Sequence, residues 1–480
     1  MVLNRFEVAA ARRGLNRRSV NANDRPDPAA TMGSDRLSQI DHIVILMMEN
    51  HSFDNYFGML KGRGDAGLVV DDRGVPSAVN KAADGSMIRL RRFDGTTQKH
   101  AVPSQSWNAS HIQFDDGTCA GFVRSIEQTL PGRDASVAMT YWTEEDLPFY
   151  YGLARTFPLA TRWFCSCLGP TFPNRRFLIA ATAHGLIDDL PFGMADYPAT
   201  GTIFDLLTAH GISWVNYHHL SRIQVHWRRL SHVRGFNFVR ALAALLAGIF
   251  PQLRPAVQSK IQATADMYPM GYLRWANHLQ SFNEFWVAAR TGRLPSVSIV
   301  DPDFSRCSEE NPQDIQCGEG FAAKVINAVM NGPAWPKTLL IWLYDEHGGY
   351  YDHVSPPAAV EPDGVPGLSP MQRFPLLQLL RFTKYGKQIQ AIDDGPVTYN
   401  RLGFRVPAVI VSPYAKPGYV TDKVYDHTSI LKLIERKWNL PPLTRRDAAA
   451  IDPLDALDFD NPPHFLTPPL LPEPARPWRG

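Results

Sequence analysis

Apolar stretches alternate with amphipathic segments along this chain. Apolar, β-branched runs, the pattern of buried strands, cover residues 43–48, 212–217, 297–300, 338–344 and 406–412. Helical spacing of apolar positions marks residues 202–209, 321–331 and 429–437. Strands that alternate with helices predict a parallel sheet. Because the strand runs are apolar on both faces, we expect an α/β chain in which helices cover both sides of a mostly parallel sheet.

Length and composition predict how the chain is divided into domains. The chain has 480 residues, 44% of them apolar, which is enough for one large α/β domain or for two to three ordinary ones. Residues 1–36 are polar and predict a flexible N-terminal arm, whereas seven prolines among the last twenty residues predict an irregular tail at 464–480. We therefore expect the folded domain at residues 37–463.

Charge and cysteine content exclude several functions. The formal net charge is only +2 and no basic block runs along the chain, so we expect no nucleic-acid partner. The five cysteines form no CxxC pair, which excludes a zinc ribbon and a disulfide scaffold. Whether Cys307 and Cys317 form a bridge stays open. No apolar run of signal-peptide length follows the arginine pairs near the N-terminus, so we expect no export signal in the chain as written.

One segment differs from the rest in charge. Residues 206–265 contain no acidic residue, and basic residues gather around an apolar run at 241–250 that is too short to span a bilayer. We expect a basic helical insertion at about 221–270. Three alternatives stay open: the segment contacts an anionic membrane surface as a peripheral helix, it covers the mouth of an active site, or it packs as a helical hairpin on the domain.

Polar side chains follow two of the predicted strands directly. "HIVILMMENHSF" ends its apolar run at Glu49 and Asn50, and "TLLIWLYDEHGGYYDHV" ends its run at Asp345, Glu346 and His347. Ligands of open α/β sheets bind beyond the carboxyl ends of the strands. Neighbouring carboxylates repel each other unless a cation or a proton lies between them. Either cluster alone could be an ordinary polar loop, but the two together favour a metal site.

Two further segments carry candidate site residues. In "CLGPTFPNRRFLIAATA", Thr171 is expected to cap a helix that begins near Phe172, with Arg175 in its early turns. The same helix N-terminus suits a phosphate oxygen, so Thr171 is either a simple cap or part of a phosphate site. In "VYDHTSILKLIERKW", His427 precedes a helix and is either a structural hydrogen-bond partner or a proton carrier.

Taken in order, five segments resemble a known family. "HIVILMMENHSFDNYFG", "GPTFPNRRF", "YDEHGGYYDHV", "RVPAVIVSPYAKPGYV" and "YDHTSILKLIE" are similar to the signature blocks of the bacterial phosphoesterase family that includes phosphatidylcholine-type phospholipases C and the acid phosphatase A group. The similarity extends over about residues 41–463. It implies a three-layer α/β/α sandwich with a mostly parallel central sheet, like that of alkaline phosphatase and the sulfatases.

The resemblance also implies roles for individual residues. The metal-site positions of the family correspond to Glu49, Asn50, Thr171, Asp345 and Glu346, and Thr171 also matches the nucleophile. Further catalytic positions correspond to His111, His347 and His427. Positions expected to contact substrate are His111, Arg175, Asn311, Asp314, Asp352 and His353.

Two departures from the family pattern bear on rate and on substrate preference. Where many relatives have a histidine in a "DHPP.D" stretch, this chain has Asn311 within "DPDFSRCSEENPQD". Asparagine cannot transfer a proton at neutral pH, so either Asn311 only hydrogen-bonds substrate or another residue has taken over the role. Thr161 stands where several members have an aspartate before the Trp-Phe pair.

We therefore expect a metal-dependent hydrolase of phosphoric esters, phospholipase C-like, that cleaves phosphodiesters such as phospholipid head groups through Thr171. An acid phosphatase-type phosphomonoesterase and a catalytically decayed lipid- or partner-binding protein are the alternatives. An all-oxygen ligand set favours one calcium or magnesium ion, and a histidine in the set would favour zinc. The resemblance implies a secreted or periplasmic location.

Overall fold

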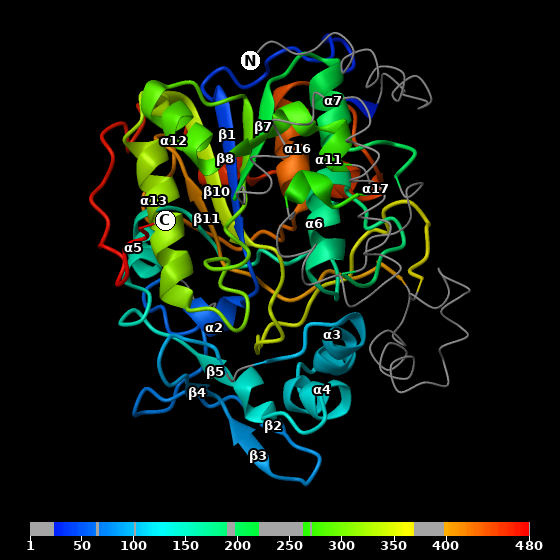
Figure 1. Ribbon diagram of the computed structural model, residues 1–480, viewed down its shortest axis with the longest axis vertical. Coiled ribbons are helices and arrows are strands. Elements are labelled where there is room, and N and C mark those ends of the chain that lie inside the picture. Colours follow the sequence, from blue (N-terminus) through cyan, green and yellow to red (C-terminus); the bar gives the residue numbers. More distant parts are fainter. Residues whose placement is uncertain are drawn as a thin grey trace.

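The computed structural model describes residues 24–63, 67–99, 102–189, 197–219, 263–268, 271–368 and 398–479. Its centre is an eight-stranded sheet (Figure 1). The order across the sheet is β12 (Val420–Thr421), β6 (Leu159–Ala160), β11 (Ala408–Val411), β10 (Thr338–Tyr344), β1 (His42–Met48), β9 (Val297–Val300), β7 (Trp214–His218) and β8 (Leu279–Ser281). Only β11 runs antiparallel to its neighbours, so the expected mostly parallel sheet is confirmed.

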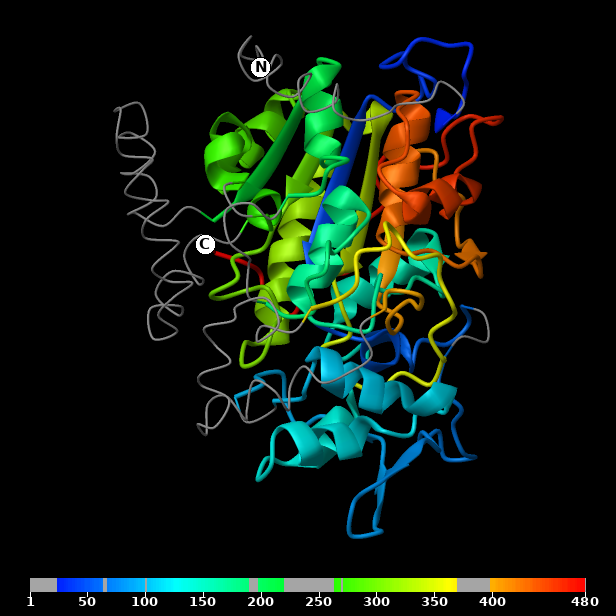
Figure 2. The same cartoon turned by 90° about the vertical axis from the view of Figure 1, so that its right-hand side faces the viewer.

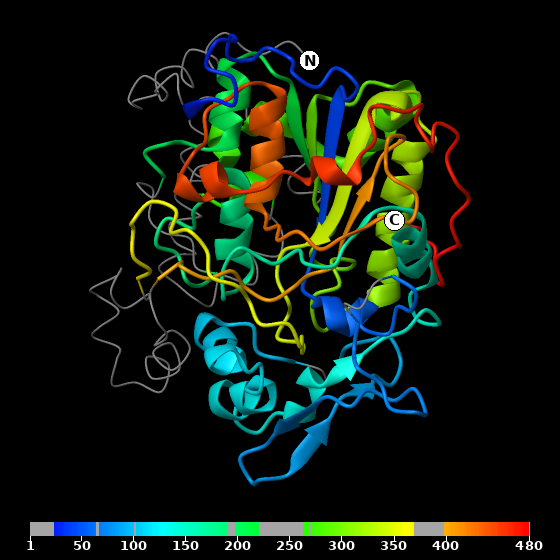
Figure 3. The ribbon, with the colours of Figure 1, turned by 180° about the vertical axis from the view of Figure 1, so that it is seen from behind.

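Helices cover both faces of this sheet, as Figures 1 and 2 show. One layer contains α5 (Pro148–Thr156), α12 (Phe282–Thr291) and α13 (Ile315–Met330). The other contains α6 (Thr171–Ala180), α7 (Ile203–Ala209), α11 (Gly271–Arg274), α16 (Thr428–Lys437) and α17 (Arg445–Ala449). Seen from behind, the two layers flank the strands (Figure 3). The three-layer α/β/α sandwich is therefore confirmed.

The central strands are apolar because both of their faces are covered. Ile43, Val44 and Leu46 of β1 are fully buried, as is every side chain of β10. Burying one such aliphatic side chain contributes about 1.5–3 kcal/mol, so these two strands contribute strongly to the stability of the sheet. Their register pairs Met48 with Tyr344, which brings the residues after each strand to the same edge.

A smaller region covers that edge of the sheet, at the bottom of Figure 1. It contains α2 (Phe53–Phe57), α3 (Trp107–Phe114), α4 (Phe122–Thr129), the hairpin of β2 (Val79–Lys81) and β3 (Met87–Arg89), and the pair of β4 (Arg91–Arg92) and β5 (Thr140–Tyr141). Over the described chain as a whole, short 3-10 helices lie at Asp115–Gly117, Ala135–Ala138, Thr264–Asp266, Ala276–His278, Trp335–Lys337 and Pro453–Ala456. The carboxyl ends of the strands are thus enclosed.

Both ends of the described chain pack on the sandwich. Gly33 N donates to Trp438 O at the end of α16, and Trp478 contacts the rings of Phe282 and Phe321. Most of the expected basic insertion at about 221–270, and residues 1–23 of the expected arm, lie outside the described residues. Among the described residues, no helix combines the length and the apolar character needed to cross a membrane.

Candidate active site

The ends of β1 and β10 bring the predicted acidic residues together. Asp345 N donates to Met48 O at 3.2 Å, which continues the strand pairing into the two polar segments. Glu49, Asn50, Asp345 and Glu346 are each at most 2% exposed. Four polar side chains at one buried point need partners, because unpaired buried polar groups are costly.

Asn50 lies at the centre of this group. The oxygen and nitrogen of its side-chain amide can exchange places. One of these two atoms lies 2.8 Å from Asp345 Oδ1 and 3.1 Å from Glu346 Oε1. With the amide nitrogen in that position, Asn50 donates to both carboxylates and its oxygen accepts from Gln105 Nε2 at 3.1 Å. With the oxygen there, three oxygens converge at the spacing found around a bound cation, whose metal–oxygen distances are about 2.0–2.6 Å. The second arrangement also brings Thr171 Oγ1 to 3.5 Å from Asn50 Oδ1.

Thr171 is the first residue of α6, so its expected role as the helix cap is wrong. Pro170 occupies the N-cap position, and no side chain caps this helix. The reason is that the chain enters α6 through extended backbone at Pro170, which places Thr171 inside the first turn. The Thr171 hydroxyl is therefore not used in capping. It lies 6% exposed at the positive end of the helix.

Arg175 supplies the positive charge among these groups. It is fully buried, and its guanidinium lies 2.8 Å from Asp345 Oδ2, 3.0 Å from Asp301 Oδ1 and 3.5 Å from Glu49 Oε1. The charges of these carboxylates outweigh burial, so the pKa of Arg175 rises. Arg175 is expected from sequence to contact substrate; here it joins three strand ends to α6.

The negative charge that these carboxylates would carry when ionised exceeds the single positive charge of Arg175. Burial raises the pKa of Glu49 and of Glu346 well above the usual range, and that of Asp345 to about 6. Glu49 Oε2 is buried and has no hydrogen-bond partner among the described residues. Since ionised carboxylates in contact need a cation or protons, this oxygen set fits a hard divalent ion.

Two of the predicted histidines lie against this group. His347 Nε2 is 2.7 Å from Gln113 Oε1 and its Nδ1 is 3.2 Å from Glu346 Oε2. His427 Nε2 is 2.7 Å from Asp345 O. Burial lowers the pKa of His347 to about 3 and that of His427 to about 4, so both rings are neutral at pH 7. A neutral imidazole can accept a proton there but cannot supply one as imidazolium.

Three other predicted residues, His111, Asn311 and Asp314, contact partners outside this group. The ring of His111 lies 4.9 Å from that of Trp107, and Trp107 in turn packs against Gly169, two residues before Thr171. Asn311 Nδ2 donates to Tyr350 Oη at 2.9 Å. Asp314 caps α13 by accepting from Gln316 N, and it pairs with Arg476 at 2.7 Å.

Comparison with known protein families shows to which family the chain belongs. The pattern of the phosphoesterase family matches residues 40–441. The chain belongs to the phosphoesterase family. It is thus a hydrolase of phosphoric ester bonds.

Three relatives of this phosphoesterase carry specific names. Phospholipase C B of Mycobacterium tuberculosis is 30% identical over 463 residues, which are 90% of this chain and 80% of the relative. Phospholipase C A of the same organism is 28% identical over 453 residues, again 90% and 80%. Non-specific phospholipase C6 of Arabidopsis thaliana is 27% identical over 463 residues, 91% of this chain and 76% of the relative.

A second group of potential metal ligands in the phosphoesterase consists of Asp54, Asp352 and His353, whose ligand atoms lie within 4.8 Å of one another. Arg405 already lies among them, because it donates to Asp352 Oδ1 and to Asp54 Oδ1 at 2.9 Å each. His353 Nδ1 is 2.6 Å from Asp54 Oδ2, and its pKa rises because Asp54 outweighs the effect of burial. The guanidinium supplies here the charge that an ion would otherwise bring.

Sequence reasoning missed three acidic residues near the site. Asp301 follows β9 and could have been found, because it stands at a strand end as Glu49 does. Asp189 Oδ1 accepts from Phe172 N at 2.9 Å. Burial and the nearby charge of Asp345 raise the pKa of Glu310 to about 7. Asp189 and Glu310 lie in loops without periodicity, so no local pattern marks them.

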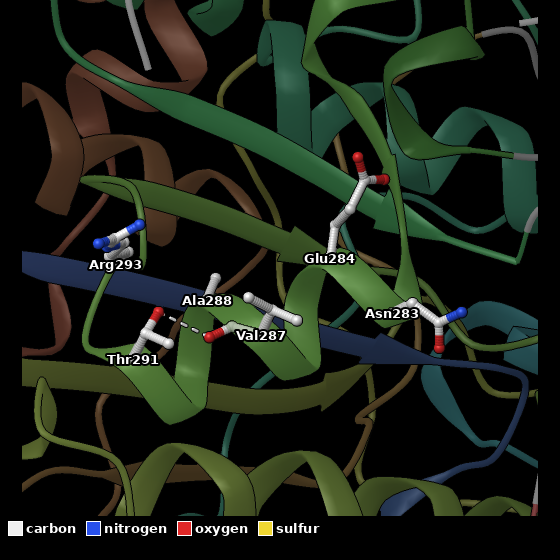
Figure 4. Close-up of a pocket in the computed structure, with 6 residues that line it drawn as sticks. All are labelled: Asn283, Glu284, Val287, Ala288, Thr291 and Arg293. Atoms are coloured by element: carbon white, nitrogen blue, oxygen red, sulfur yellow. Dashed lines mark hydrogen bonds between the residues drawn. The ribbon is translucent and has the colours of Figure 1, made fainter. Parts of the chain in front are cut away.

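A surface hollow on the phosphoesterase is unrelated to this chemistry. It has a volume of about 370 Å³ and lies along one side of α12, between Asn283 and Arg293. Figure 4 shows its lining side chains, with Thr291 donating to Val287 O. No predicted site residue lines it, so the buried group around Asn50 remains the candidate active site.

Proposed function

We propose that this chain is a metal-dependent phosphodiesterase of the phospholipase C type, with Thr171 as its nucleophile. The observation that carries the proposal is the placement of the Thr171 hydroxyl, at the start of α6 and 3.5 Å from the Asn50 amide oxygen. That amide position faces Asp345 and Glu346, and a cation bound among them would need the oxygen there. The names of the relatives support a phospholipid substrate.

The ligands of the ion are Glu49, Asn50, Asp345, Glu346 and the Thr171 hydroxyl. All are oxygen donors, which favours calcium or magnesium over zinc. A cation held there would lower the pKa of the Thr171 hydroxyl and polarise the phosphoryl group. Arg175 contributes by fixing Glu49 and Asp345 relative to α6, because it contacts both carboxylates.

The Thr171 hydroxyl would release its proton to solvent and attack phosphorus, and the alcohol would leave from the opposite side. The N–H of Thr171 would stabilise charge on a phosphoryl oxygen at the start of α6, because Asp189 already accepts from Phe172 N and Pro173 has no N–H. Because His347 and His427 are neutral, Glu310 is the better proton donor to the leaving alcohol: its pKa of about 7 keeps it partly protonated at neutral pH. Water next releases the phosphoryl group from Thr171, with a neutral histidine as the base.

Substitutions at Thr171 test the nucleophile. We expect Thr171→Val to lose at least about 1000-fold in kcat, as removal of a nucleophile does, and Thr171→Ser to keep most of the activity because it keeps a hydroxyl. Turnover of p-nitrophenyl phosphorylcholine compared with p-nitrophenyl phosphate separates diester from monoester preference. Full activity of Thr171→Val would refute the proposal.

The covalent step has its own readout. Trypsin cleavage after Arg162 and Arg175 places Thr171 on the peptide of residues 163–175. Acid quenching during turnover of p-nitrophenyl phosphate should yield this peptide with one added phosphoryl group. Quenching during turnover of p-nitrophenyl phosphorylcholine should yield it with one added phosphorylcholine group. The same peptide from Thr171→Val should carry neither group.

Three further features stay proposals. We place the catalytic domain at residues 37–463, between the arm at 1–36 and the tail at 464–480. Membrane contact by the insertion at about 221–270 and a secreted or periplasmic location also remain predictions. Flotation of the full chain with anionic liposomes tests the membrane contact.

A further inference from the structure

Two cysteines enclose the loop that approaches the active site between β9 and α13. Cys307 is fully buried at the start of this loop, and Cys317 lies half-buried in the first turn of α13. Their thiols are close enough to form a hydrogen bond with each other. Eleven residues, 307 to 317, are thus closed into a ring by a contact between two sulfur atoms.

The loop between these thiols is held firmly in place. Glu309 accepts hydrogen bonds from Tyr56, Tyr150 and Tyr344 at 2.5–2.6 Å. Gly318, next to Cys317, packs directly against the Glu309 side chain and leaves no room for a Cβ. The residues next to each cysteine, Glu309 and Gly318, are therefore packed against each other across the loop.

The two thiols differ in reactivity from the other cysteines. The hydrogen bond from Cys307, together with the nearby Arg476 and Arg306, lowers the pKa of the Cys317 thiol to about 7. Burial raises the pKa of the Cys119 thiol to about 12 and that of the Cys165 thiol further still. Only thiolates attack disulfides, so among these cysteines Cys317 is the reactive one.

We propose that Cys307 and Cys317 form a reversible disulfide that closes the loop carrying Glu310 and Asn311. The oxidant is a low-molecular-weight disulfide such as oxidised glutathione. The Cys317 thiolate attacks one of its sulfurs, forms a mixed disulfide and releases one glutathione thiolate. Cys307 then loses its proton and attacks Cys317 Sγ, which expels the second glutathione. In sum, two protein thiols are oxidised and one glutathione disulfide is reduced to two thiols.

The bond would lie next to the proposed metal site. Ser308, which follows Cys307, accepts from Glu49 N at 3.0 Å through its backbone oxygen, and its side chain hydrogen-bonds the Glu49 carboxylate. The disulfide would thus fix the backbone that supports Glu49. Its formation does not depend on the proposed phosphodiesterase activity, so the two proposals can fail separately.

The printed sequence allows a direct assay. Trypsin cleaves after Arg306 and Lys324, so both cysteines lie on one peptide, residues 307–324. The full chain is reduced, freed of reductant, incubated with oxidised glutathione at pH 8, and then blocked with N-ethylmaleimide before digestion. We expect this peptide to lose two hydrogens and to take up no maleimide, whereas without oxidant and after unfolding it takes up two.

The peptide of residues 163–175 is the matched control, because it contains the two buried cysteines Cys165 and Cys167. It should stay reduced in the oxidised protein, and native-state maleimide labelling of this peptide would reveal any unfolded material. In Cys307→Ser, we expect a stable glutathione adduct on Cys317. In Cys317→Ser, we expect Cys307 to remain a thiol.

Two results would overturn the proposal. One is a wild-type peptide 307–324 that still takes up two maleimides after oxidation. The other is a wild-type Cys317 that accumulates glutathione while Cys307 stays free, as in the Cys307→Ser variant.

Discussion

Replacing Arg175 with methionine tests the electrostatics of the candidate active site. Arg175 is fully buried and contacts Asp345, Asp301 and Glu49 at 2.8, 3.0 and 3.5 Å. Removing one partner of a buried ion pair costs about 3–5 kcal/mol, because the remaining charges lose their counter-ion in a medium that screens them poorly. We expect Arg175→Met to lower the free energy of unfolding by at least this amount when no divalent cation is present.

An exposed arginine provides the matched control. Arg92 also contacts two carboxylates, Glu145 and Asp146, but its side chain is 42% exposed. Solvent screening limits such a pair to about 0–1 kcal/mol, so Arg92→Met should change stability little. Urea denaturation of both variants and of the wild type, followed by tryptophan fluorescence, measures the difference.

The same variant also tests the proposed ion. A divalent cation among Glu49, Asp345 and Glu346 would replace part of the charge lost with Arg175, so calcium or magnesium should restore part of the stability of Arg175→Met. The reasoning is wrong if Arg175→Met loses no more than Arg92→Met. The proposed ion is refuted if neither cation changes the stability of Arg175→Met or of the wild type.

Three other predictions concern single residues. Burial raises the pKa of Glu319 to about 8, so Glu319 keeps its proton in the folded state over a pH range in which the unfolded chain loses it. The free energy of unfolding therefore falls as pH rises from about 4 to 8. Glu319→Gln should remove up to about 1.4 kcal/mol per pH unit of this dependence, measured by denaturation at several pH values. Asp189 occupies the Phe172 N–H at the start of α6, so Asp189→Ala, which frees this N–H, should lower the inhibition constant of inorganic phosphate several-fold; an unchanged constant in steady-state assays would contradict this. Gly318→Ala should lower the free energy of unfolding by about 1–3 kcal/mol, because its Cβ would overlap Glu309; wild-type stability in urea would show that the loop yields.

The central sheet could be predicted because its strands differ sharply from the residues that follow them. The run at 338–344 is the observed β10, and the run at 43–48 differs from β1 by one residue. The direction of β11 could not be predicted, since an apolar run reads alike in both directions. The small region that covers the sheet edge was also missed, because its strands have only two or three residues.

The candidate site was predictable where a side chain follows a strand and was missed where it lies in a loop. Glu49 and Asp345 were found from the sequence and lie together, since parallel strands end at one edge. Thr171 was expected as the cap of α6, but it is the first residue of that helix. Asp189 was missed because only the tertiary fold brings it to Phe172.

The central claim is that a divalent cation lies among Glu49, Asn50, Asp345 and Glu346, beside the Thr171 hydroxyl. Anomalous diffraction from crystals soaked in manganese, which replaces calcium or magnesium at oxygen sites, tests it most directly. The account predicts a peak about 2.0–2.5 Å from Asp345 Oδ1 and the Asn50 amide oxygen. A peak only within the group of Asp54, Asp352 and His353, or no peak together with the Asn50 amide nitrogen facing both carboxylates, would contradict it.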